Sequence, residues 1–175
     1  MRTEISALLV IALAILWTPA HAAGTGHAAH EHGVSKLDIA FDGSNLEIEL
    51  SSPGMDIVGF EHAAATPGDK ETVSNALSAL RAKTGTISLP AAAECSLREA
   101  HATFGEDEHG HHAATDHREI SAHWHFSCTQ PDQLTHIDVD LFDLFPNIGT
   151  VEVRAITSRG QVGAKLTAKQ RRLKF

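Results

Sequence analysis

Residues 34–50 read VSKLDIAFDGSNLEIEL, and this stretch carries the clearest structural signal in the chain. Apolar and polar residues alternate on both sides of Asp42-Gly43-Ser44-Asn45, which has the composition of a hairpin turn. We therefore predict a β-hairpin, with strands at 34–41 and 46–50, that buries one of its faces.

Residues 66–85 have the pattern of a helix. Val73, Ala76, Leu77 and Leu80 recur at helical spacing, and Asp69 stands where an N-cap is expected. We interpret the apolar stripe as part of the core.

Residues 95–104 and 117–128 have the composition of two strands. If they pair antiparallel with Cys95 opposite Cys128, the register opposes Leu97 to Phe126, Glu99 to Trp124 and Thr103 to Ile120. Alternate residues from Ile120 to Cys128 then share a buried face, and His123 and His125 lie on the other face.

Further strand patterns at 136–142, 150–156 and 162–166 bring the number of strands to six or seven. Connections are mostly short. These features predict an α+β domain with an antiparallel sheet, one main helix and a histidine-rich hairpin loop at 105–117. The basic residues 165–174 predict a solvated tail.

The first 22 residues have the order of a secretory signal peptide. An apolar run from Ile5 to Trp17 precedes Ala20-His21-Ala22, a small-x-small cleavage site. We predict cleavage after Ala22, export to the periplasm, and one domain over residues 23–175 without stable membrane insertion. The alternative is an uncleaved membrane anchor, although such a span needs about 20 apolar residues.

Export places both cysteines in an oxidising compartment. We therefore expect a disulfide between Cys95 and Cys128, which would contribute roughly 3–4 kcal/mol in the chain-entropy model. The alternative is a thiolate metal pair, which the wide spacing of the two cysteines disfavours.

The formal net charge of −8 argues against a nucleic-acid partner, whose recognition requires a basic surface. An acidic surface instead attracts cations. Thirteen histidines strengthen this expectation, because imidazole binds zinc, copper and nickel. The candidate metal ligands are His30, His32, His62, His109, His111, His112, His117, His123 and His125.

These candidates differ in setting. The loop at 105–117 mixes imidazoles with carboxylates, both of which bind zinc, and the alternative is a hydrophilic loop that binds weakly. The leader at 23–33 is expected to be flexible. His123 and His125 are about 6.5–7 Å apart along a strand, which allows both imidazoles to bind one ion. The alternative is that they are two exposed strand histidines beside a buried Trp124. His62 follows an apolar segment. It is a candidate metal ligand, and the alternative is a core or capping role for its side chain.

The sequence has no H-E-x-x-H helix, nucleophile elbow, P-loop or G-x-G-x-x-G pattern. We therefore expect no enzymatic activity. A zinc hydrolase would require an ordered site of three ligands and a bound water.

Several stretches together resemble the ZrgA-like family of periplasmic zinc-binding proteins. They are His30-Glu31-His32-Gly33, Ser51-Ser52-Pro53, Val58-Gly59-Phe60-Glu61-His62, Leu141-Phe142-Asp143-Leu144-Phe145-Pro146 and Gly160-Gln161. The resemblance spans nearly the whole mature chain. It implies zinc binding in support of zinc acquisition and a histidine-rich loop between the cysteine-bearing strands. The family pattern carries over to His30, His32 and His62.

The leading hypothesis is a periplasmic protein that captures or buffers zinc for a transporter component. The alternatives are a protein that sequesters copper or nickel and a secreted interaction module whose histidines are incidental.

Overall fold

The computed structural model describes residues 31–82, 85–105 and 117–175. The predicted signal peptide, most of the leader and His30, His109, His111 and His112 lie outside these residues. Within them the strands are β1 (Val34–Asp42), β2 (Asn45–Pro53), β3 (Ile87–Ser88), β4 (Cys95–Gly105), β5 (Glu119–Cys128), β6 (His136–Val139), β7 (Thr150–Thr157), β8 (Gly160–Leu166) and β9 (Arg172–Lys174). The helices are α1 (Gly54–Ile57), α2 (Pro67–Arg81) and α3 (Leu141–Leu144), with 3-10 turns η1 (Ala91–Ala93) and η2 (Pro131–Gln133).

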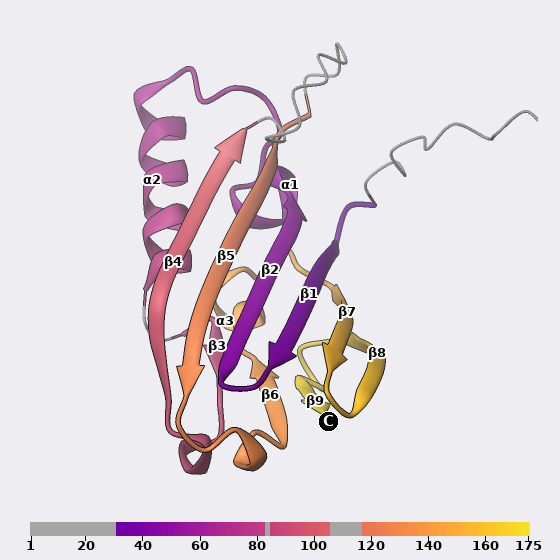
Figure 1. Cartoon of the computed structure of the whole chain (residues 1–175). Helices are drawn as coiled ribbons and strands as arrows, with labels where there is room; N and C mark the ends of the chain where they lie inside the picture. The colour runs from indigo at the N-terminus through magenta and orange to yellow at the C-terminus, as the bar shows by residue number, and fades with distance from the viewer. Residues whose placement is uncertain (1–30, 83–84, 106–116) are drawn as a thin grey trace, which may run out of the picture.

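A six-stranded sheet in the order β4-β5-β2-β1-β7-β8 forms the larger layer (Figure 1). The predicted hairpin is confirmed, since β1 and β2 pair antiparallel and close with Asp42 opposite Asn45. Gly43 in the turn has φ of +57°, which glycine adopts without steric cost. The alternation of the sequence therefore determines both strands and their buried face.

The expectation of a wholly antiparallel sheet is wrong. β1 and β7 pair in parallel, from Val34 beside Thr150 to Phe41 beside Thr157, so the large sheet is mixed. Parallel neighbours need a long connection, and here it contains most of the chain. The periodicity of a strand reports its buried face and not the direction of its neighbour, so the sequence pattern contained no signal for this pairing.

The pairing of the cysteine-bearing strands is confirmed, with a correction to its register. Cys95 opposes Cys128 and forms a disulfide with it, and Leu97 opposes Phe126. A β-bulge between Leu97 and Glu99 then shifts the register by one residue, so Glu99 opposes His125 and not Trp124. The same shift places Ser121 opposite Thr103 and Ile120 opposite Phe104. A bulge inserts one additional residue into one strand, which simple alternation does not predict.

β5 has the predicted division between its two faces. The residues of its inner face are at most 7 % exposed, and they are Ile120, Ala122, Trp124, Phe126 and Cys128. Trp124 also donates its indole N–H to the carbonyl oxygen of Leu80 at 2.8 Å, which satisfies a buried donor and ties α2 to the sheet.

α2 begins one turn earlier than Asp69, so the predicted N-cap is wrong. Thr66 is the N-cap, and its hydroxyl accepts the N–H of Asp69 at 3.1 Å. Asp69 reaches back to accept the N–H of Thr66 at 3.0 Å, which completes a capping box. Ala76 and Leu80 are buried and Val73 and Leu77 pack against the core, as expected.

A second sheet, in the order β3-β6-β9, increases the number of strands beyond the predicted six or seven. The basic C-terminal residues are not a solvated tail, because β9 pairs with β6 and buries Leu173. The strand expected at 136–142 ends at Val139, and α3 follows it.

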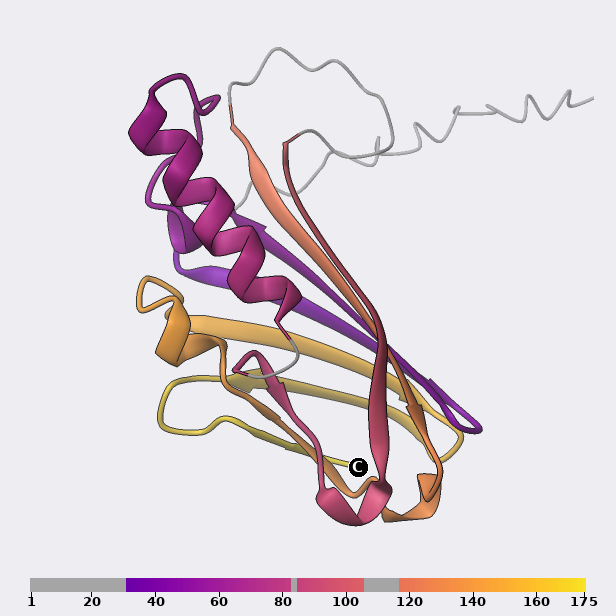
Figure 2. The same ribbon diagram turned by 90° about the vertical axis from the view of Figure 1, so that its left-hand side faces the viewer.

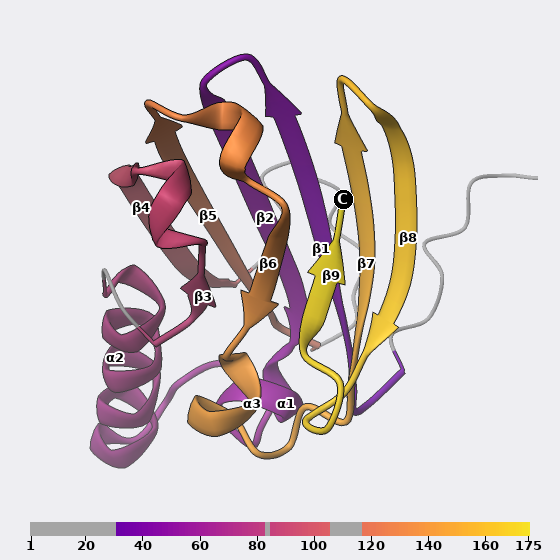
Figure 3. The ribbon, with the colours of Figure 1, turned by 90° about the horizontal axis from the view of Figure 1, so that it is seen from below.

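The small sheet, α2 and α3 lie on one side of the large sheet and enclose the core (Figures 2 and 3). In the described part of the chain, no helix or strand covers the opposite face of the large sheet, which is turned to the viewer in Figure 1. We call this uncovered side the outer face. It carries His123 and His125, as predicted.

Candidate metal-binding site

One end of the large sheet gathers segments that are far apart in sequence. β1 begins here and β2 ends here, and α1 follows β2 directly, while β5 also begins at this end (Figure 1). Side chains immediately before β1, after α1 and before β5 therefore lie close together. They include His32, Glu61 and His117.

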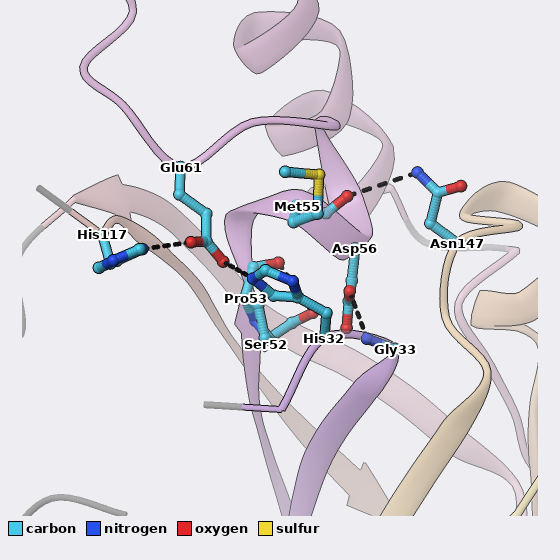
Figure 4. A network of polar contacts seen from close by, with 9 residues as sticks. All are labelled: His32, Gly33, Ser52, Pro53, Met55, Asp56, Glu61, His117 and Asn147. Carbon is cyan, nitrogen blue, oxygen red and sulfur yellow. Dashed lines mark hydrogen bonds and ion pairs between the residues drawn. The ribbon is translucent and has the colours of Figure 1, made fainter. Parts of the chain in front are cut away.

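Glu61 is the centre of this group (Figure 4). The Nε2 atom of His32 lies 3.1 Å from its Oε1 atom, and the Nδ1 atom of His117 hydrogen-bonds to its Oε2 atom. The Glu61 side chain is only 11 % exposed, whereas those of His32 and His117 are 59 % and 66 % exposed. One largely buried carboxylate thus binds two accessible imidazoles, one through each oxygen.

The backbone of Arg118 positions His117 beside Glu61. Its N–H donates to the carbonyl oxygen of Glu61 at 2.8 Å, and its carbonyl oxygen accepts the N–H of Gly54 at 2.9 Å. Gly54 is buried, and a Cβ there would lie 2.5 Å from the carbonyl oxygen of Phe60 and 2.7 Å from that of Arg118. Only glycine allows these backbones to approach so closely.

Gly33 positions His32. Its N–H donates to Asp56 Oδ1 at 2.7 Å, and its carbonyl oxygen accepts the N–H groups of Gly149 and Thr150 at 2.9 and 2.8 Å. The start of β1 is thereby fixed between α1 and the start of β7. His32, one residue earlier, is held within reach of Glu61.

Asp56 is 2 % exposed, and burial raises the pKa of its carboxyl group. The hydrogen bond from Gly33 and the nearby His32 act in the opposite direction, while Glu61 adds to the increase. Within the described residues, the second oxygen of Asp56 is buried without a hydrogen-bond partner. A buried carboxyl group of this kind favours its neutral form.

His62 does not join this group. Its ring stacks on Phe60 with the centroids 4.6 Å apart, and its Nδ1 atom lies 3.0 Å from the carbonyl oxygen of Ala63. His62 is exposed, so the structure gives it neither a core position nor a contact with the Glu61 carboxylate. His123 and His125 lie apart from both, on the outer face, where each contacts Glu47.

Across residues 31–82, 85–105 and 117–175, no three His, Cys, Asp or Glu side chains are already arranged around a metal position. The Glu61 group is held by hydrogen bonds between its members. It nevertheless contains two imidazoles and one carboxylate, which are competent zinc ligands. Both imidazole rings are more than half exposed, so they are accessible from solvent.

Sequence reasoning identified the histidines but not the carboxylates that join them. Glu61, Glu47 and Asp56 were absent from the candidate ligands. For Glu61 there was a local signal, since it precedes His62 in a stretch that resembles a known family. For Glu47 there was none, because its partner lies on a strand 76 residues away.

Comparison with protein families decides the affiliation of the chain. Residues 29–175 match the model of the ZrgA family of zinc uptake proteins. The chain belongs to the ZrgA family. A comparison with curated proteins found no match. The ZrgA match includes the disulfide and every described residue of the Glu61 group, so the candidate site lies within the part of the chain that matches the family model. Among the described helices, none has the length and hydropathy to cross a membrane.

Proposed function

We propose that this ZrgA family protein captures zinc in the periplasm and holds it for uptake, with Glu61, His32 and His117 as the ordered ligands. The observation that carries the proposal is the shared carboxylate, whose two oxygens contact imidazoles from distant parts of the chain. A carboxylate and two imidazoles form a zinc ligand set, with a fourth position for water or another side chain.

The geometry suits an ion that must enter and leave. Ligands about 2.0–2.2 Å from a tetrahedral zinc ion lie roughly 3.2–3.6 Å from one another. The separation between His32 Nε2 and Glu61 Oε1 is 3.1 Å, which is close to this range. Because the Glu61 side chain is largely buried and both rings face solvent, the ion would meet one buried carboxylate and two accessible imidazoles.

The remaining predicted ligands flank this site in sequence. His30 is two residues before His32, and the loop with His109, His111 and His112 ends at His117. We propose that these segments supply weaker ligands that raise the local concentration of zinc, and that a transporter component receives the ion. Reversible binding of this kind requires no catalysis, and we propose that the protein is not an enzyme.

The decisive experiment compares Glu61→Gln with the mature protein in zinc titrations at neutral pH. Glutamine preserves the shape but removes the negative charge, so we expect the tightest zinc site to weaken at least tenfold, or about 1.4 kcal/mol. Glu71→Gln, which alters an exposed carboxylate on α2, is the matched control and should leave the titration unchanged.

Acidification provides a second test. Ordinary imidazole has a pKa of about 6.5, so protons compete with zinc below that pH. Zinc binding that survives acidification, or that is identical in Glu61→Gln and Glu71→Gln, contradicts the proposal. The metal content of protein purified without added metals separates zinc capture from copper or nickel sequestration.

A further inference from the structure

The outer face of the large sheet carries a second group of imidazole and carboxylate side chains. Glu47 on β2 lies opposite His125 on β5. Its Oε2 atom is 2.6 Å from His123 Nε2, and its Oε1 atom is 3.6 Å from His125 Nε2. The side-chain oxygen of Asn45 is 3.5 Å from the same nitrogen of His125. Two strands thus present two imidazoles, one carboxylate and one amide oxygen to each other.

The core fixes this arrangement. Asn45 and Glu47 are two residues apart on β2, as His123 and His125 are on β5, so all four share one face. The residues that alternate with them along the two strands, Leu46, Ile48, Trp124 and Phe126, are buried on the other face. A slip of one residue would expose that apolar set, so the register and the grouping of the polar residues are strongly specified.

This group is separate from the Glu61 site. Glu47 lies near the start of β2, and the Glu61 site is at the end of β2, beyond Pro53. Six residues of extended strand cover about 20 Å. A single ion therefore cannot bind to both groups, and variants in one leave the ligands of the other in place.

We propose that Asn45, Glu47, His123 and His125 form a second zinc site on the outer face of the sheet. The separations of 2.6 and 3.6 Å between Glu47 and the two imidazole nitrogens bracket the roughly 3.3 Å expected between two ligands of one tetrahedral ion. The ion takes the place of the proton that joins His123 to Glu47. Asn45 supplies a neutral oxygen at the fourth position.

The surroundings allow an ion to reach the site. The side chains of Glu47 and His123 are each 43 % exposed and that of His125 is 30 % exposed. Glu47 and His123 also line a shallow groove of about 680 Å³ that continues over β1, β7 and β8. An ion therefore gains access from solvent, while its ligands lie on two paired strands.

Imidazole nitrogen NMR of the mature protein tests the proposal, because it reports each histidine separately from the others. On addition of zinc, the ring resonances of His123 and His125 should shift together and saturate together. Glu47→Gln should weaken that response at least tenfold. Glu49→Gln changes the next carboxylate on the same face of β2 and should leave the response unchanged. His125→Gln provides a second variant, in which the His123 response should also weaken.

The same spectra distinguish this proposal from the function of the Glu61 site. In Glu61→Gln the response of His123 and His125 should persist while that of His32 and His117 weakens at least tenfold. If His123 and His125 do not respond to zinc when His32 and His117 do, the outer-face group is only an ion pair and the second site is wrong. Equal weakening by Glu47→Gln and Glu49→Gln would likewise overturn it, since the effect would then be one of general charge.

Discussion

Carboxylates, more than histidines, organise the polar chemistry of this protein at the scale of single residues. Glu61 joins two imidazoles, and Glu47 joins two others. Asp56 contacts no imidazole but orders the start of β1 through the N–H of Gly33. Burial of Asp56 raises the free energy of its charged form, because a carboxylate is less stable when it is removed from water.

Asp56→Asn should change the pH dependence of stability. Burial raises the folded-state pKa of Asp56 above its unfolded value. Its contribution to stability is therefore fully present below the unfolded pKa and is lost as pH rises through the folded pKa. Asparagine retains an oxygen for Gly33 and carries no charge, so the variant should become more stable relative to the wild type as pH rises. Urea unfolding of both metal-free proteins across the acidic to neutral range measures this difference, and a difference independent of pH would contradict the assignment.

At the scale of elements, the junction of α1, residues 59–61 and β5 positions the candidate site. Gly54 lies where these three segments meet, and its N–H and carbonyl groups bond to Arg118, Val58 and Gly59. The backbone oxygens that face Gly54 cannot move without disturbing Glu61 and His117. The site therefore depends on a close contact between backbones as well as on its own side chains.

Gly54→Ala should destabilise the fold by about 1–3 kcal/mol, the usual cost of forcing an additional methyl group into a packed interior. It should also weaken zinc binding, because the clashing oxygens belong to Phe60 and Arg118. Gly68→Ala is the control, since a Cβ in the first turn of α2 lies 3.8 Å from its nearest neighbour, Thr66. It should be neutral or stabilise by up to about 1 kcal/mol. Thermal unfolding compares the two, and equal stabilities would show that the close contact at Gly54 relaxes without cost.

At the scale of the whole molecule, the C-terminal strand completes the second layer. β9 pairs with β6, and Arg172 donates two hydrogen bonds of 2.7 Å to Asp138. Those bonds lower the pKa of the Asp138 carboxyl group. The stability that they provide is present above the unfolded pKa and is lost as pH falls through the folded pKa.

Leu173→Ala should destabilise the protein by about 2–5 kcal/mol, because it removes a side chain that is 2 % exposed in the core between the two sheets. Lys174→Ala, one residue further along β9, alters an exposed side chain and should have little effect. Urea unfolding measures both. A small and equal effect of the two substitutions would mean that the end of the chain does not stabilise the core.

Much of the fold could be predicted because its signals are local. The β1–β2 hairpin required only alternation and a turn, and the disulfide required only two cysteines in a chain with an export signal. No local sequence signal marked three other features. They are the bulge after Leu97, the parallel pairing of β1 with β7 and the pairing of β9 with β6. Each of these depends on a partner strand that periodicity does not identify.

The sequence by itself determined the buried faces of β1, β2 and β5, the outward position of His123 and His125, and the resemblance to the ZrgA family. Only the tertiary structure decided which carboxylate each histidine meets. His32 and His117 reach Glu61 across 29 and 56 residues, and His123 reaches Glu47 across 76. The physical reason is that hydrophobic periodicity depends on one strand and its buried face, whereas a ligand site depends on the order and register in which several strands pack.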